Sequence, residues 1–165
     1  MNLYFNRIDF TDPETFSPSA ALVPRPVLLL YAAHFFVSEV HNGGFLQFFW
    51  NSTGLMAPES VLGFEAIGMP KLAALLVEVA TPLGTPYPRD RNARWDALLI
   101  ASGRTESDLK EIFERAPNLY VAFEEAIEPL SFKERNRQAW DLARTENGGF
   151  QEAATRFAQN LHPVQ

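Results

Sequence analysis

Apolar residues recur every three or four positions along most of this 165-residue sequence, which is the spacing of one face of an α-helix. The clearest stretch is the last one, in which the apolar positions are Phe150, Ala153, Ala154, Phe157, Ala158 and Leu161. The alternation of every second residue that marks a half-buried strand never lasts beyond a few positions. We therefore expect an all-α fold of roughly seven to nine helices, with no substantial sheet.

Proline and glycine divide the sequence into helical segments, because proline favours a helix start and glycine a helix end. Residues 1–24 carry three prolines, and we expect an irregular segment with short helical turns beginning at Thr11 and Ser17. Capping boxes predict helix starts at Thr105 and Ser131, and Pro117 should break the first of these helices. The expected helices cover approximately residues 26–41, 45–51, 58–68, 70–82, 93–101, 105–116, 119–127, 131–146 and 150–161.

The length suits one domain, and we expect residues 1–165 to form a single helical domain. Hydrophobic residues make up 47% of the sequence and charged residues 21%, which is typical of a globular protein. Residues 1–10 lack the pattern of a signal peptide, and the most apolar stretch, residues 27–37, is too short to span a membrane. The sequence contains no cysteine, which excludes disulfides, zinc ribbons and thiol catalysis. We expect a cytoplasmic protein that does not associate with membranes.

The net charge of −6 limits the class of partner. Direct binding to nucleic acid needs a basic face that neutralises phosphates, and this balance of charge argues against one. We therefore expect a protein partner and no direct contact with nucleic acid.

Acidic residues concentrate between positions 106 and 128, where seven carboxylates against two basic residues, Lys110 and Arg115, give a local net charge of −5. A contiguous acidic surface of this kind competes with DNA phosphates for a basic protein surface. The alternative is an ordinary solvated helix face near a helix N-terminus. The candidate protein-binding residues are Glu106, Asp108, Glu111, Glu114, Glu124, Glu125 and Glu128.

The densest group of polar and aromatic residues spans positions 39–51. A helix should end within two residues at Gly43 and Gly44, so one of these glycines is expected at positive φ. Gln47 and Asn51 lie four residues apart on one face of the next helix, and we expect both to be largely buried and hydrogen-bonded to the backbone. Two interpretations stay open: a structural corner in which amide side chains tie a buried turn, or a recognition corner with a ligand or enzymatic pocket.

Patterns for catalysis or metal binding are weak. His34, Ser38 and His41 share one helix face, but two helical turns, about 10 Å, separate the imidazoles, which is too far for one metal ion. No glycine-rich phosphate loop or nucleophile elbow is present. We predict no metal, no cofactor and no catalytic residue, which favours a non-enzymatic protein. An open pocket lined by His41, Gln47 and Asn51 would instead favour an enzyme.

The tetrapeptide Asn-Gly-Gly-Phe occurs twice, at residues 42–45 and 147–150. The residues around the two copies do not match well. Either the chain contains an old duplication, or two helix corners use the same terminator chemistry.

The spacing E-x-x-N-G-G-F-x-Q-F-F-x-N is formed by Glu39, Asn42, Gly43, Gly44, Phe45, Gln47, Phe48, Phe49 and Asn51. This spacing resembles the signature of a bacterial family named after DNA mimic protein 19, whose shared region is a domain of unknown function. The resemblance extends over about residues 20–160 and is strongest at residues 39–51.

The resemblance implies an all-helical domain of similar length. The named member looks like a homodimeric DNA mimic that occupies the DNA-binding surface of a helix-turn-helix transcription factor, so a protein partner and a homodimer are what the resemblance implies. Mimicry depends on a strongly acidic surface, whereas this chain carries a net charge of only −6. Three functions stay open: a protein-binding regulator of the DNA-mimic type, a small-ligand or enzymatic pocket at residues 42–51, and an immunity-like accessory protein.

Overall fold

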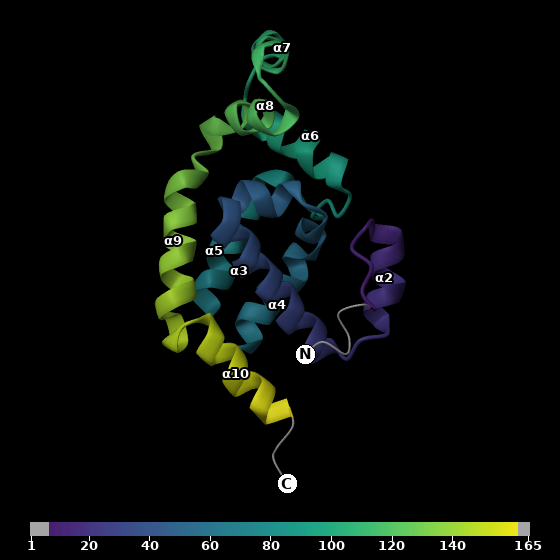
Figure 1. Cartoon of the computed structure of the whole chain (residues 1–165), viewed down its shortest axis with the longest axis vertical. Helices are drawn as coiled ribbons and strands as arrows, with labels where there is room; N and C mark the ends of the chain where they lie inside the picture. Colours follow the sequence, from purple (N-terminus) through teal and green to yellow (C-terminus); the bar gives the residue numbers. More distant parts are fainter. Residues whose placement is uncertain (1–6, 162–165) are drawn as a thin grey trace.

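The computed structural model describes residues 7–161 and is shown in Figure 1. Within these residues the chain forms nine α-helices and four 3-10 helices and contains no strand, which confirms the all-α prediction. The α-helices are α2 (Pro13–Ala21), α3 (Arg25–Trp50), α4 (Ala57–Ala66), α5 (Pro70–Ala80), α6 (Arg91–Ala101), α7 (Glu106–Arg115), α8 (Leu119–Ala126), α9 (Phe132–Thr145) and α10 (Phe150–Leu161). The 3-10 helices are η1 (Ser52–Met56), η2 (Thr81–Leu83), η3 (Glu128–Leu130) and η4 (Glu146–Gly148).

Side-chain caps determine where several helices begin. In each case a side-chain oxygen accepts a hydrogen bond of 2.8–3.1 Å from the backbone N–H three residues later. The capping residues are Asp12, Asp90, Thr105 and Asn118. At Thr105 the bond is reciprocated, since Asp108 accepts from the Thr105 N–H at 3.0 Å, and the predicted capping box is confirmed.

The predicted capping box at Ser131 and the predicted separate helical turn at Ser17 are wrong. Ser131 adopts a left-handed conformation, with φ of 55°, and makes no capping hydrogen bond, although α9 does begin directly after it. At the N-terminus, Pro13–Ala21 is one nine-residue helix with Pro18 inside it, where we expected separate turns and an irregular segment. The helix is continuous because Phe16 and Ala20 are buried together in a satellite cluster with α3, and this packing overrides the local signal at Ser17.

Helix α3 lies at the centre of the molecule, with α4 and α5 beside it and α9 along one edge (Figure 1). Phe36 on α3 is 1% exposed, and its ring meets those of Phe45, Phe48 and Phe64 edge-on at centroid distances of 5.0–5.5 Å. Gly63 brings α4 against α3, because a Cβ there would collide with a backbone carbonyl of α3. The core is therefore rich in phenylalanine, and α3 supplies most of its centre.

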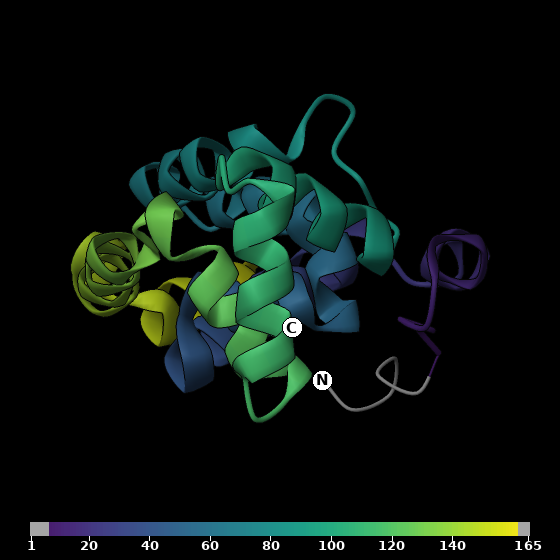
Figure 2. The same ribbon diagram turned by 90° about the horizontal axis from the view of Figure 1, so that it is seen from above.

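Helices α6, α7 and α8 form one end of the molecule (Figure 1). Figure 2 shows α7 lying lengthwise across this end as the outermost element. Its main packing partner is α8, through a small cluster of Ile112, Ala122 and Ala126 that is separate from the central core. The segment that carries the acidic candidates is therefore a projecting pair of helices.

Candidate functional site

The corner at residues 39–51 is a kink within α3. Gly43 (φ −155°, ψ 16°) and Gly44 (φ 75°, ψ −167°) leave the helical conformation, and the predicted positive φ is confirmed at Gly44. Helical structure resumes at once at Phe45 and continues to Trp50. A Cβ at Gly44 would also collide with the side-chain amide of Asn136, so this position needs glycine for its conformation and for space.

The carboxylate of Glu39 joins the two sides of the kink. Its oxygens accept hydrogen bonds from Gln47 Nε2 at 2.7 Å, Asn51 Nδ2 at 2.8 Å and Thr53 Oγ1 at 2.8 Å. We predicted that both amides would be largely buried and bonded to the backbone. Both are partly buried, but the predicted partner was wrong, because each amide donates to the Glu39 side chain. Folding α3 back at the glycines brings its two halves together, which spacing along one straight helix does not reveal.

Helix α9 contacts both sides of the kink. Asn136 Oδ1 accepts from the Phe45 N–H at 2.8 Å, and Trp140 Nε1 donates to the Val40 carbonyl at 3.2 Å. The kink frees these two backbone groups from the α3 hydrogen-bond ladder, and α9 satisfies them. The sequence shows Asn136 and Trp140 on one face of a helix but gives no signal of what that face contacts.

Arg94 on α6 donates hydrogen bonds to backbone carbonyls at the C-terminal end of α3. Its side chain is fully buried and donates to the carbonyls of Phe49 at 3.2 Å and Asn51 at 2.8 Å, and also to that of Arg89. Burial lowers the pKa of Arg94, and carbonyl oxygens rather than a carboxylate surround the guanidinium. The sequence analysis missed this residue. Its only signal was a basic residue four positions before Leu98, on the inward face of α6.

Tyr87 supports the segment after the motif. Its hydroxyl donates to the Gly54 carbonyl at 2.8 Å, and its burial raises the pKa of the phenol. A Cβ at Gly54 would collide with the Phe48 carbonyl, so α3 and η1 are packed closely at this point.

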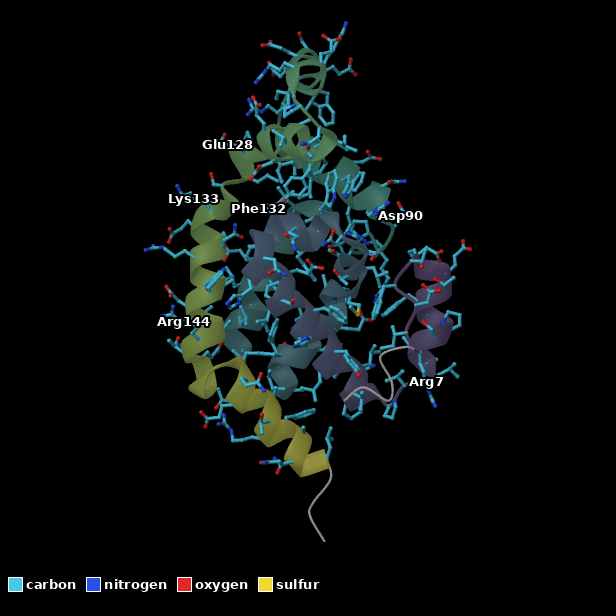
Figure 3. All side chains as sticks on the ribbon, viewed as in Figure 1. Arg7, Asp90, Glu128, Phe132, Lys133 and Arg144 are labelled. Carbon is cyan, nitrogen blue, oxygen red and sulfur yellow. The ribbon has the colours of Figure 1, made fainter. Side chains whose placement is uncertain are left out.

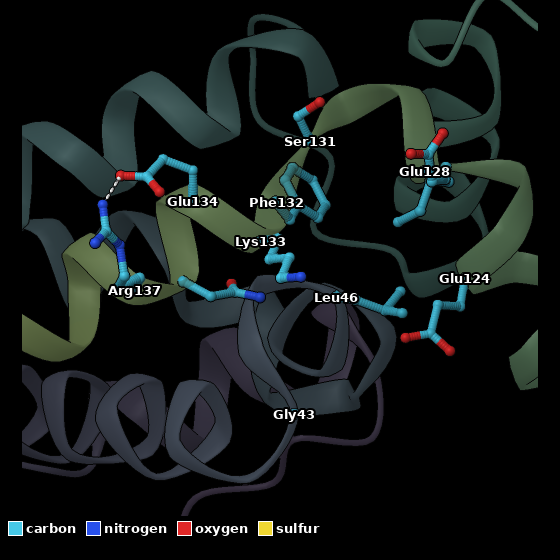
Figure 4. Close-up of a pocket in the computed structure, with 11 residues that line it drawn as sticks. Gly43, Leu46, Glu124, Glu128, Ser131, Phe132, Lys133, Glu134 and Arg137 are labelled. Atoms are coloured by element: carbon cyan, nitrogen blue, oxygen red, sulfur yellow. Dashed lines mark hydrogen bonds and ion pairs between the residues drawn. The ribbon is translucent and has the colours of Figure 1, made fainter.

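A groove of about 870 Å³ lies beside the kink, between α8 and α9 (Figure 4). It is lined by Gly43, Leu46, Glu124, Ile127, Glu128, Ser131, Phe132, Lys133, Glu134, Asn136 and Arg137. Neither His41 nor Gln47 nor Asn51 is among these residues, so the groove is not the pocket that would have favoured an enzyme. Its lining does include Gly43 of the family motif, the neighbouring Leu46, and two of the acidic candidates, Glu124 and Glu128.

The seven acidic candidates lie on α7, α8 and η3 and differ in their neighbours. Asp108 accepts hydrogen bonds from Thr105 Oγ1 at 2.7 Å and from its N–H at 3.0 Å, which lower the pKa of its carboxyl group. Three candidates have a basic neighbour: Glu114 has Lys110, Glu125 has Arg115 and Glu128 has Arg104. Three make no ion pair with any residue in the range 7–161: Glu106, Glu111 and Glu124.

The histidine face of α3 does not converge on a site. His34 is exposed, with its ring 6.4 Å from that of Phe150. His41 is also exposed, and its ring lies tilted against that of Trp140 with the centroids 3.7 Å apart. Within the described part of the chain, no group of three or more histidine, aspartate or glutamate side chains is placed to hold a metal ion. No helix in that part is long and apolar enough to cross a lipid bilayer.

The second Asn-Gly-Gly-Phe corner resembles the first only in part. Gly149 (φ 91°, ψ 157°) matches the conformation of Gly44, and each glycine precedes a phenylalanine that begins helical structure. The residues before it differ, since Asn147 and Gly148 both have positive φ. Asn147 Nδ2 donates to the Ile67 carbonyl at 2.8 Å, which fixes this corner to the end of α4.

The fold and the corner define a helical domain in which a kinked central helix is tied to α6 and α9. The chain belongs to the DMP19-like protein family, whose family model matches residues 21–163. This confirms the family resemblance found at residues 39–51. No curated protein and no solved structure matches the chain.

Proposed function

We propose that the protein is a non-enzymatic, protein-binding regulator that acts as a DNA mimic. In this proposal the acidic surface of α7 and α8 occupies the basic, DNA-binding surface of a partner protein. The observation that carries the proposal is the placement of residues 106–128, with a net charge of −5, on a projecting pair of helices at one end of the molecule (Figure 1). Membership of the DMP19-like family is consistent with this function.

The unpaired carboxylates support this surface as the contact region. Glu106 and Glu111 are exposed on α7 and make no ion pair within residues 7–161, so their charge is available to a cationic partner. Exposed charges of one sign steer association and raise its rate.

Exposed apolar side chains on the same helices provide a second source of binding energy. Phe113 on α7 is 36% exposed, and Leu119 and Val121 on α8 are 52% and 37% exposed. Apolar residues among charged ones are typical of protein interfaces, in which buried contacts supply affinity. A purely electrostatic mimic needs no such residues.

The corner at residues 39–51 has a structural role in this proposal. The Glu39 carboxylate already accepts three hydrogen bonds from the chain, which leaves it poorly suited to act as a general base. Through Gly43 and Leu46 the corner also supports the groove beside α8.

The resemblance to a bacterial family also implies a homodimer, and the sequence predicts a cytoplasmic location; we include both in the proposal. Light scattering coupled to size-exclusion chromatography measures the mass directly. A mass near 18.6 kDa, that of one chain, would remove the dimer from the proposal.

The test of mimicry removes charge from α7 and leaves its fold intact. Asp108 belongs to the capping box, so the variant is Glu106→Gln, Glu111→Gln and Glu114→Gln. A control that removes as many charges elsewhere is Glu65→Gln, Asp96→Asn and Asp141→Asn, all exposed. Both variants change the net charge from −6 to −3. Partners captured from extract of the native cell are identified, and their association rates are measured against salt concentration.

If the proposal holds, the captured partner binds DNA, and DNA competes with this protein for it. Association slows as salt rises, and the α7 variant associates more slowly than the control variant. If the affinity for the partner does not change with salt concentration, and the α7 and control variants change it equally, mimicry through this surface is contradicted.

A further inference from the structure

The groove between α8 and α9 contains charged side chains of opposite sign that do not pair with each other. Glu124 and Lys133 both line it, both are exposed, and neither makes an ion pair within residues 7–161. Figure 4 shows Glu124 and Glu128 at one end, Glu134 and Arg137 at the other, and Lys133 between them. The charges of Glu124 and Lys133 are therefore available to a ligand, whereas Glu128 is near Arg104 and Glu134 pairs with Arg137. One end of the groove is acidic and the other carries an ion pair.

Between the charged ends the groove has an apolar floor attached to the core. Leu46 and Ile127 are 6% and 3% exposed and belong to the central cluster. Phe132 packs against Phe45 and Phe49 at ring distances of 6.1 and 6.2 Å. The floor is thus fixed by the same corner that contains the family motif, and its shape does not depend on surface side chains.

We propose that this groove binds an extended peptide segment of a protein partner. The segment would place a lysine or arginine between Glu124 and Glu128 and an apolar side chain on Leu46 and Phe132. Lys133 would donate to a carbonyl or carboxylate of the segment. Charge complementarity and the apolar floor together select this occupant over nucleic acid, whose phosphates Glu124 and Glu128 would repel.

The size of the groove also fits a peptide. Its volume of about 870 Å³ lies near the upper end of the range of roughly 300–1,000 Å³ that is usual for ligand pockets. A single ion or amino acid would leave one end of such a groove empty. The inference rests on the proposed function in that the partner is a protein, but it assigns specificity to residues of the groove rather than to the charge of α7.

The experiment selects peptides directly on the whole protein. A displayed library of random decapeptides is enriched on the full chain, and the recovered peptides are labelled with fluorescein for anisotropy titrations. We expect enriched peptides to share one basic residue with an apolar residue nearby. Glu124→Lys should weaken their binding about tenfold or more, because it places like charges together. Glu111→Lys, the same charge reversal on α7 outside the groove, should leave the Kd unchanged.

A charge exchange provides the sharper readout. Changing the basic residue of an enriched peptide to glutamate should abolish binding to the wild type and restore it to Glu124→Lys. Lys133→Glu should weaken the original peptide, and circular dichroism should show all variants folded, since each replaced side chain is exposed. Failure to enrich any peptide, or equal binding to wild type, Glu124→Lys and Lys133→Glu, would overturn the inference.

The two proposals fail separately. If the α7 variant binds its partner as well as the control variant does, but the charge exchange restores peptide binding, mimicry is wrong and the groove remains a peptide site. If the α7 variant behaves as proposed and no peptide responds to the groove substitutions, mimicry stands and the groove is not a peptide site.

Discussion

At the scale of single residues, Glu39 and Arg94 hold the part of α3 that follows the kink. Glu39 accepts from three side chains on the far side of the kink, and Arg94 donates to the carbonyls of Phe49 and Asn51, where the second half ends. Both are charged, but Glu39 satisfies side-chain donors, whereas Arg94 satisfies backbone carbonyls at the C-terminal end of α3. An Arg94 replacement by lysine would supply fewer donors in a different geometry, so the two residues are not interchangeable here.

The role of Glu39 predicts a measurable loss of stability. Glu39→Ala removes the shared acceptor of Gln47, Asn51 and Thr53, and should lower the free energy of unfolding by about 1–3 kcal/mol. Glu39→Gln should also be destabilising, because its own NH₂ group would face other donors. Urea unfolding measures both. Glu65→Ala on α4, an exposed carboxylate, is the control, and a Glu39→Ala loss no larger than that of the control would contradict the network.

At the scale of helices, the kink in α3 and its packing against α9 decide where the corner lies. Gly44 has φ of 75°, and the Asn136 side chain fills the space that a Cβ would take. Helix α7 shows the opposite case, in which a local capping box sets the start of a helix with few tertiary contacts. The kink in α3 therefore depends on tertiary packing, whereas the start of α7 depends on local capping hydrogen bonds.

The kink predicts a coupling between two residues far apart in sequence. Gly44→Ala should cost more than about 2 kcal/mol, since it combines backbone strain with a collision. Gly103→Ala, also at positive φ but facing open space, isolates the strain and should cost less. Asn136→Ala leaves the Phe45 N–H unpaired and is destabilising alone, yet the double variant should lose less than the sum because the collision is gone. Additive losses in urea unfolding would refute this coupling.

The capping box of α7 predicts a dependence on pH. Hydrogen bonds from Thr105 lower the pKa of Asp108 in the folded state, so the carboxylate stabilises the fold above its unfolded value of 3.8. This contribution is lost as the pH falls from 3.8 through the folded-state pKa. Asp108→Asn should therefore be less stable than the wild type at neutral pH, with a difference that shrinks in acid. Thr105→Ser keeps the hydrogen-bond donors and should keep the pH dependence of stability. If the stability difference between Asp108→Asn and the wild type does not change with pH, the capping role of Asp108 is contradicted.

At the scale of the whole molecule, stability and charge are distributed unevenly. The aromatic core surrounds α3, whereas α7 rests mainly on α8 through a small satellite cluster. Figure 3 shows charged side chains around the projecting α7 end, with Glu128 and Lys133 on the groove side and Asp90 beside α6 on the opposite side. The proposed contact surface thus has little support from the central core.

This distribution predicts a gradient of protection against hydrogen exchange. Backbone amides of α7 should exchange much faster than those of α3 within the same folded protein, because local opening of α7 exposes few buried apolar groups. Exchange followed by mass spectrometry gives the protection of each helix. Equal protection of α7 and α3 would show that the projecting helices unfold only with the whole domain.

The sequence by itself determined most helix boundaries and a positive φ at one of Gly43 and Gly44, because these depend on local chemistry. Proline, glycine and capping side chains act within about four residues of themselves, and the 3.6-residue periodicity selects the buried face. The motif at residues 39–51 also sufficed to place the chain in its family. The failure at Ser17 had a tertiary cause, because packing of Phe16 and Ala20 against α3 in a satellite cluster made α2 continuous.

Only the tertiary structure decided what the motif contacts. Glu39 meets Gln47 and Asn51 because the chain turns at the glycines, and Asn136 reaches Phe45 across 91 positions of sequence. The bonding of a buried arginine to backbone carbonyls, as at Arg94, leaves no periodic trace, since carbonyls are present at every residue. The groove likewise arises where α8 and α9 meet the kink, and its lining combines segments about 80 residues apart. Such contacts follow from how helices pack, which local propensity does not specify.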